Sequence, residues 1–262
     1  VPAVAAKIVE VSNLRKDAIF QIDHPTTETD TTMTNANAAE KIATFAKTYA
    51  GATNAWVAFW AVHEGYIVNP YQNNAQVLAP ASAFIAPAIA AEYATNFNWK
   101  APAGADNLAI TNFAALNKVW TQAERDTLYA ANVNPVLNYK GLGYTAMGQK
   151  SGQTRNTAMN RLNVVQLHNY VKLTSEEMSA SFLFAPIDDE TFNAWKSRES
   201  KILTNIKQNR GLYDFLIKLD WETVTSDDVA NNRMPAIVKI KPTRTAEFID
   251  VDLVIKNYSD TL

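Results

Sequence analysis

The chain has 262 residues, of which 47% are hydrophobic and 19% charged, and its formal net charge is −2. This composition permits one large or two ordinary folded domains, argues against global disorder, and gives no general attraction to nucleic acid or anionic membranes. There is no cysteine, which excludes disulfides, thiol catalysis and cysteine-bound zinc. No apolar run reaches the roughly 18 residues of a membrane-spanning helix.

The start of the chain carries neither an initiator methionine nor a signal peptide. It reads Val1-Pro2-Ala3 and enters a periodic segment soon afterwards. We therefore expect a processed or excised fragment of a longer protein.

The first half of the chain predicts alternating strands and helices. Residues 17–23 form a short apolar strand, and residues 55–63 are a continuous apolar run typical of a central strand. Between them, residues 38–49 have apolar side chains at helical spacing, and residues 79–95 predict another helix. This order favours a β-α-β arrangement, and a turn-rich stretch places a soft domain boundary near residue 112.

The second half predicts an α+β unit. Thr121 and Glu124 have the spacing of a capping box, which marks a helix start. Residues 161–173 and 189–210 fit helices, and residues 213–221 alternate apolar and polar residues as a strand does. Together with the end of the chain, these elements predict a three-stranded sheet backed by two helices.

The most distinctive pattern is a predicted hairpin near the C-terminus. Residues 236–241 and 248–255 both alternate apolar and charged residues, as half-buried strands do. One register places Asp250 and Asp252 opposite the two lysines of the first strand and joins apolar residues on the other face. Because a two-stranded ribbon is marginal alone, its outer edge could accept a strand from another molecule.

Catalytic and cofactor motifs are weak. A serine hydrolase is the rival interpretation, with Ser82 as nucleophile, Asp23 as acid and His63 or His168 as base, but the Gly-x-Ser-x-Gly elbow is missing. The histidines lack metal-motif spacing, and the glycines lack the spacing of a phosphate loop. We therefore predict no catalytic residue, no cofactor and no metal, and a monomeric binding module is a third possibility.

A modest basic cluster surrounds the glycine-containing loop. It consists of Lys150, Arg155 and Arg161. A solvated loop is the default interpretation, and a contact with an acidic partner surface is the sharper alternative.

The order of several short motifs resembles the tail sheath proteins of contractile bacteriophages and related injection systems. The most specific match is Trp-Lys-Ala-Pro-Ala-Gly at residues 99–104, which looks like the family's x-K-A-P-A-G element. Met147 and Lys150 depart from the family, which usually has Trp and Arg there. The other similar segments are residues 17–25, 79–82, 133–136, 143–151, 161–162, 184–186 and 240–242.

The resemblance covers nearly all of this chain but only the later part of a sheath protein, without the N-terminal portion of the family's fold. It implies a partial subtilisin-like α/β domain at residues 1–112, without protease activity, and an α+β C-terminal domain with an antiparallel sheet at residues 113–262. The divergence points to a distant branch, such as that of a giant phage. Phage, bacteriocin and secretion-system sheaths all stay open.

The function implied by the resemblance is mechanical. Sheath subunits polymerise as six-fold rings around the tail tube and contract to drive the tube through the host envelope. The implied partners are neighbouring subunits, the tube protein, the baseplate and the tail terminator, with no nucleic acid and no membrane insertion. The implied location is the phage tail, after assembly in the host cytoplasm.

Two interaction regions follow from the resemblance. The edge to which neighbouring subunits add a strand would comprise Phe248, Val251, Leu253 and Ile255. A weaker candidate for tube contact is the set Lys196, Lys201 and Lys207. If the neighbour-donated strand lies upstream of Val1, this fragment should be monomeric.

Overall fold

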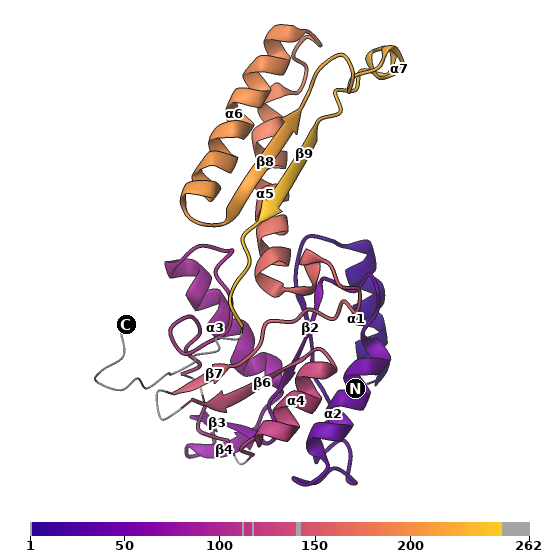
Figure 1. Cartoon of the computed structure of the whole chain (residues 1–262). Helices are drawn as coiled ribbons and strands as arrows, with labels where there is room; N and C mark the ends of the chain where they lie inside the picture. Colours follow the sequence, from indigo (N-terminus) through magenta and orange to yellow (C-terminus); the bar gives the residue numbers. More distant parts are fainter. Residues whose placement is uncertain (1, 112, 117, 140–142, 248–262) are drawn as a thin grey trace, which may run out of the picture.

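The computed structural model describes residues 2–111, 113–116, 118–139 and 143–247. The described chain forms two units joined end to end (Figure 1). We call residues 2–161 the lower unit and residues 162–242 the upper unit. Helix α5 (Leu162–Ser179) rises from the lower unit into the upper one.

A four-stranded sheet forms the centre of the lower unit. Its order is β1-β2-β6-β7, with β1, β2 and β6 parallel and β7 antiparallel. The strands are β1 (Phe20–Ile22), β2 (Val57–Ala61), β6 (Val133–Asn138) and β7 (Tyr144–Ala146). All five residues of β2 are buried, which confirms the predicted central strand. The predicted β-α-β arrangement is also present, because helix α2 connects β1 to β2.

Helices cover both faces of this sheet. They are α1 (Pro2–Leu14), α2 (Ala38–Tyr49), α3 (Ala81–Thr95) and α4 (Gln122–Ala130). Successive residues of β2 point to opposite faces, so Phe59 packs with α1, α2 and α4 while Trp60 packs with α3. The short helix η1 (Ala158–Asn160) precedes α5.

A second small sheet lies in the lower unit, and the sequence did not predict it. Its order is β4-β3-β5, formed by β3 (Gly65–Asn69), β4 (Ala75–Leu78) and β5 (Ala115–Leu116). The β3–β4 turn contains Asn73 and Asn74, both with positive φ. Much of the hairpin is half-exposed or exposed, so its apolar alternation is weak.

The upper unit is a two-stranded antiparallel ribbon packed on two helices. Its elements after α5 are η2 (Ala180–Phe182), α6 (Asp189–Gln208), β8 (Leu212–Lys218), α7 (Ser226–Ala230) and β9 (Ile237–Pro242). Strands β8 and β9 pair only with each other among the described residues, so the predicted third strand is not seen there. The predicted hairpin partner of β9, residues 248–255, lies outside the described residues.

The predicted soft boundary near residue 112 does not coincide with an edge of the central sheet. Strands β6 and β7 follow that boundary in sequence but pair in the same sheet as β1 and β2. The molecule narrows instead where α5 leaves the lower unit (Figure 1). In the described part of the chain, no helix is both long enough and apolar enough to span a bilayer.

Trp99 joins the two units. Its indole Nε1 donates a hydrogen bond to the carbonyl of Asn209 at 3.0 Å, and its ring belongs to the apolar cluster of α5, α6 and β8. Gly211 makes this contact possible, since a Cβ there would lie 3.0 Å from the Trp99 ring and 2.6 Å from Ile206. The most specific family-like motif therefore supplies a structural contact between the units.

Candidate assembly interface

Strand β9 presents an edge that no described residue covers. Its residues alternate between half-buried and exposed, as predicted from the sequence. On the exposed face Lys241 lies opposite Asp214, so the acidic neighbour seen for Lys241 comes from β8. The inner-face residues of the ribbon pack on α5 and α6; they are Phe215, Ile217, Val238 and Ile240. An edge strand with one apolar face can take up another strand.

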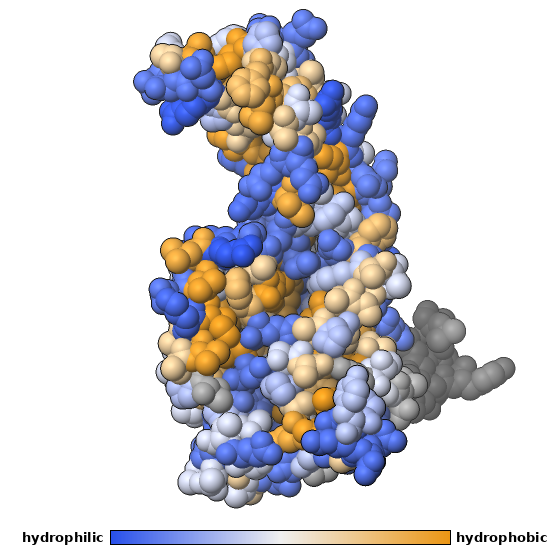
Figure 2. All heavy atoms as spheres, turned by 180° about the vertical axis from the view of Figure 1, so that it is seen from behind, coloured by the Kyte–Doolittle hydropathy of each residue, from blue (hydrophilic) through white to orange (hydrophobic). Residues whose placement is uncertain are grey.

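A mostly apolar groove of about 1260 Å³ lies beside this edge. It is bounded by α5, by residues 180–187 and by β9, so side chains of a strand added to β9 would enter it. Figure 2 views the molecule from behind and shows apolar side chains gathered on the upper unit. The apolar lining includes Val171, Phe182, Leu183, Trp195, Val238 and Ile240.

Leu183 and Phe184 form an exposed apolar step at the rim of the groove. Their exposed fractions are 69% and 104%, and Phe184 has a φ of 67°, which is uncommon for a residue other than glycine. In the sequence, residues 184–186 stood out only as a family-like segment. Two large apolar side chains in water beside an open strand edge mark a contact surface.

The predicted assembly residues form two groups, the strand-addition edge and the tube-contact lysines. Phe248, Val251, Leu253 and Ile255 lie outside the described residues, so their role stays a prediction.

The three predicted tube-contact lysines all lie on α6, but they do not share one face. At 3.6 residues per turn, Lys196 and Lys207 are roughly 20° apart around the helix, and Lys201 is roughly 140° from Lys196. The ammonium of Lys207 is also paired with the carboxylate of Asp214 at 2.9 Å. Tube contact through these lysines stays a prediction, with Lys196 and Lys207 as the coherent pair.

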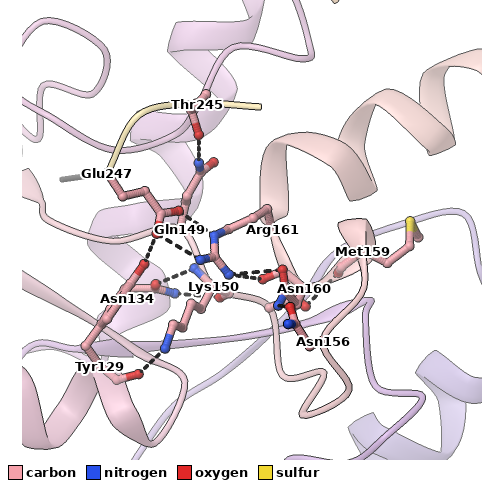
Figure 3. A network of polar contacts seen from close by, with 11 residues as sticks. Tyr129, Asn134, Gln149, Lys150, Asn156, Met159, Asn160, Arg161, Thr245 and Glu247 are labelled. Carbon is pink, nitrogen blue, oxygen red and sulfur yellow. Dashed lines mark hydrogen bonds and ion pairs between the residues drawn. The ribbon is translucent and has the colours of Figure 1, made fainter. Parts of the chain in front are cut away.

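One member of the predicted basic cluster, Arg161, binds the chain's own Glu247 (Figure 3). The Arg161 guanidinium binds the Glu247 carboxylate through two hydrogen bonds, one of 2.9 Å from Nη2 to Oε2. The Tyr129 hydroxyl donates to the same carboxylate. Arg161 and Glu247 are only 29% and 17% exposed, so this ion pair is screened less than one on the open surface. Arg155 remains exposed.

Lys150 also belongs to this network. Its Nζ donates to the Tyr129 carbonyl at 2.7 Å, and its backbone N–H donates to Asn134 Oδ1 at 2.7 Å. Burial, followed by the nearby Arg161 charge, lowers the pKa of Lys150. Burial and the Glu247 contact raise the pKa of Tyr129, so its hydroxyl stays a donor at neutral pH.

Two further contacts fix the segment that carries Glu247. The Thr243 N–H donates to the Gly211 carbonyl at 3.0 Å, and the Gln149 amide donates to the Thr245 hydroxyl. Residues 243–247 therefore cross from the upper unit to the lower unit. No sequence pattern indicated this crossing, because Glu247 and Arg161 are 86 positions apart.

The rival serine-hydrolase interpretation receives no geometric support. The Ser82 hydroxyl and backbone N–H both donate to the Asp23 carboxylate, each at 2.8 Å, so Asp23 caps the start of α3. His63 is fully buried, and neither ring nitrogen has a hydrogen-bond partner among the described residues. His168 packs edge-on against Trp56. A triad needs a histidine bonded to the serine, and here serine and aspartate bond directly.

The described residues also contain no group of three or more histidine, aspartate or glutamate side chains placed to hold a metal ion.

The fold is that of contractile sheath proteins. The structure matches a chain in the sheath complex of an extracellular contractile injection system in its contracted state, with a TM-score of 0.73. The match covers 91% of this chain and 63% of that chain at 21% identity. The TM-score shows a shared fold.

Sequence comparison points to phage proteins. No family model matches the chain. It is 30% identical over 156 residues to the tail sheath protein of Vibrio phage KVP40, covering 60% of this chain and 23% of that protein. It is 28% identical over 182 residues to the tail sheath protein of Enterobacteria phage T4, covering 70% of this chain and 28% of that protein. The chain thus spans about a quarter of the length of the curated relatives it matches.

In sequence and in fold the chain is similar to contractile tail sheath proteins. The resemblance predicted from its short motifs is confirmed.

Proposed function

We propose that this chain is part of a structural subunit of a contractile phage tail sheath. The subunit polymerises around the tail tube and contracts to drive the tube through the host envelope. Identity to phage sheath proteins of 30% and 28%, against 21% for the injection-system sheath, supports a phage tail as its location and the host cytoplasm as its place of assembly. The role is structural and uses no catalytic site.

The observation that carries this proposal is the open edge of β9 beside an apolar groove. A strand from a neighbouring subunit would bond to the β9 backbone and place alternate apolar side chains in the groove. Its other side chains would lie beside Lys239 and Lys241 on the exposed face, which favours acidic residues there. Residues 248–255 of a second copy have this pattern of apolar and acidic residues.

The lower unit would supply the rigid body that moves during contraction. Its parallel strands, covered by helices on both faces, support the finer assignment to a partial subtilisin-like domain. The tube protein, the baseplate and the tail terminator would be its further partners, with neighbouring subunits arranged in six-fold rings.

The decisive experiment substitutes Phe184→Asp in the full-length sheath protein and counts sheath tubes by electron microscopy. Phe184 is exposed and has positive φ, a conformation that aspartate tolerates, so the variant should fold normally. We expect far fewer tubes, because a charge at the groove rim opposes docking of an apolar strand.

The matched control is Tyr71→Asp, at an exposed aromatic residue in the β3–β4 turn. It should assemble normally. Normal tube formation by the Phe184→Asp protein would contradict the groove assignment.

The tube contact has a separate test. Reversing charge at Lys196 and Lys207 should weaken assembly of sheath on tubes while leaving tube-free sheath polymers unchanged. Lys201→Glu is the control from another side of α6. Assembly on tubes by the double variant at the normal level would exclude this face of α6 as the tube contact.

A further test measures the oligomeric state of the 262-residue chain alone. We expect a monomer by light scattering in dilute solution, because a single added strand is a small contact and the tube that gathers the subunits is missing from such a sample. Stable six-fold rings would contradict this expectation.

A further inference from the structure

Two segments of chain connect the upper unit to the lower unit. The first is the start of α5, which directly follows Arg161, and the second is the segment after β9, which reaches the lower unit at Glu247. Figure 1 shows the second segment descending from β9. The ion pair between Arg161 and Glu247 therefore joins the two connections across 86 positions of sequence.

The segment after β9 is bonded at every second residue. The Thr243 N–H donates to the Gly211 carbonyl in the upper unit at 3.0 Å, and Thr245 accepts a hydrogen bond from the Gln149 amide in the lower unit. Glu247 follows with its own contacts to the lower unit. The end of β9 is thus bonded first to its own unit and then to the other.

The lower unit holds Glu247 with three hydrogen bonds. Arg161 donates two of them and the Tyr129 hydroxyl donates the third (Figure 3). We call Tyr129, Arg161 and Glu247 the neck clasp. Because Arg161 and Glu247 are only 29% and 17% exposed, removal of either side chain would leave a partly buried charge without its partner.

The neck clasp is connected to the central sheet through Lys150. The Lys150 Nζ donates to the Tyr129 carbonyl at 2.7 Å, and the Lys150 backbone forms an isolated bridge with Arg161. The Lys150 N–H donates at 2.7 Å to Oδ1 of Asn134, a fully buried residue of β6. Glu247 is therefore bonded, through two residues, to the core of the lower unit.

Strand β9 needs an anchor at its C-terminal end. A two-stranded ribbon is marginal alone, and neither β8 nor β9 pairs with a third strand among the described residues. Residues 219–236 separate the two strands, so no tight turn joins them. The neck clasp lies only five positions beyond Pro242, the last residue of β9.

We propose that the neck clasp positions the assembly edge: by holding the chain that leaves β9, Arg161 and Tyr129 keep the C-terminal end of β9 paired with β8 and set it in place relative to the lower unit. They are positioning residues, since neither belongs to the lining of the groove beside β9. The inference rests on the proposed function only where it assigns that edge to a neighbouring subunit. The anchoring itself is a property of the monomer.

The test is hydrogen exchange, followed residue by residue by NMR, on the 262-residue chain and its Glu247→Gln variant. Both are studied at concentrations where they are monomeric. We expect the bonded amides of residues 212–214 and 240–243 to exchange at least roughly tenfold faster in the variant, because charged hydrogen bonds that hold this end are lost. Bonded amides at the far end of the ribbon, residues 217–218 and 237–238, should change less than roughly threefold.

Three further variants define the result. Arg161→Gln should give the same pattern, and the double variant Arg161→Gln with Glu247→Gln should add less than roughly threefold, because residues that act as one pair are not additive. Tyr129→Phe removes one uncharged donor and should accelerate the same amides by a smaller factor. The matched control Asp214→Asn removes the exposed Lys207–Asp214 pair at the same end of the ribbon and should leave these amides unchanged.

The proposal is overturned if the amides of residues 240–243 exchange at an unchanged rate in Glu247→Gln. It is also overturned if both ends of the ribbon accelerate equally, or if the two single effects add in the double variant. Should Glu247→Gln also lose protection in the central sheet, Tyr129→Phe decides by the first two criteria.

The two proposals fail separately. A negative exchange result would leave the proposed function intact, since exchange is read in monomers and assembly is read by microscopy. Conversely, normal assembly of the Phe184→Asp protein would refute the groove assignment and leave the anchoring of β9 standing.

Discussion

The two units bury their sheets to different extents. The lower unit covers the central strand β2 on both faces and both edges, and all its residues are buried. The upper unit packs one face of a two-stranded ribbon on helices and leaves the β9 edge uncovered by described residues. A central strand that is paired on both sides has fixed partners, whereas a strand with a free edge can pair with another strand.

The difference bears on the proposed function. If the chain is part of a sheath subunit, the lower unit, whose central strand is fully paired and buried, suits rigid-body motion, and the ribbon, whose β9 edge is open, suits linking of subunits. Trp99 and the Arg161–Glu247 pair connect the two units.

The largest expected effect concerns the central sheet of the lower unit. Trp60→Ala should lower the free energy of unfolding by about 3–5 kcal/mol, because a fully buried ring is lost from β2. Phe215→Ala in the half-buried ribbon should cost less, about 1–3 kcal/mol. Urea unfolding followed by circular dichroism measures both, and equal losses would remove the contrast between the units.

The second effect concerns a buried acid in the upper unit. Burial raises the pKa of Glu199, only partly offset by its hydrogen bond from Ser175, and its Oε2 has no hydrogen-bond partner among the described residues. A raised acid pKa means that stability is present below the unfolded value of 4.5 and falls as pH rises through the folded value. Glu199→Gln should therefore stabilise the chain at pH 7, on the order of 1–3 kcal/mol. Unfolding curves from pH 4 to 8 measure it, and a lower stability of the variant at pH 7 would refute it.

The third effect is a loss of stability as pH falls, which is the opposite pH dependence to that of Glu199, and it lies in the lower unit. Burial lowers the pKa of His63, and the carboxylate of Glu64, 4.0 Å from Nε2, partly opposes this. The unfolded chain then binds more protons as pH falls below 6.5, so acid destabilises the fold. Because Glu64 offsets part of the burial cost, the effect should be smaller than that of Glu199. His63→Gln should flatten the loss of stability between pH 6.5 and 5, and an unchanged pH slope would show that His63 does not contribute.

The smallest expected effect is a control on the surface. Lys207→Ala removes an ion pair whose side chains are 46% and 70% exposed, and it should change the free energy of unfolding by less than about 0.5 kcal/mol. A loss above 1 kcal/mol in urea unfolding would show that the outer face of the ribbon is more constrained than its exposure indicates.

Local signals in the sequence were reliable where neighbours in sequence make the contact. The capping box of Thr121 and Glu124 is present with both reciprocal hydrogen bonds, and Asp188 caps α6. The alternation in β9 correctly separated its half-buried residues from its exposed ones. These features depend on a few adjacent residues, so their chemistry can be read directly.

The sequence by itself determined most of the helices, the buried central strand and, through short motifs, the resemblance to sheath proteins. Only the tertiary structure decided that β9 pairs with β8, that Asp23 caps α3 from 59 positions away, and that Arg161 holds Glu247 across 86 positions. Periodicity and capping act over one or two turns of chain and leave a pattern there. Contacts between distant residues leave none, because many acidic residues could meet the same arginine and only the fold selects which one does.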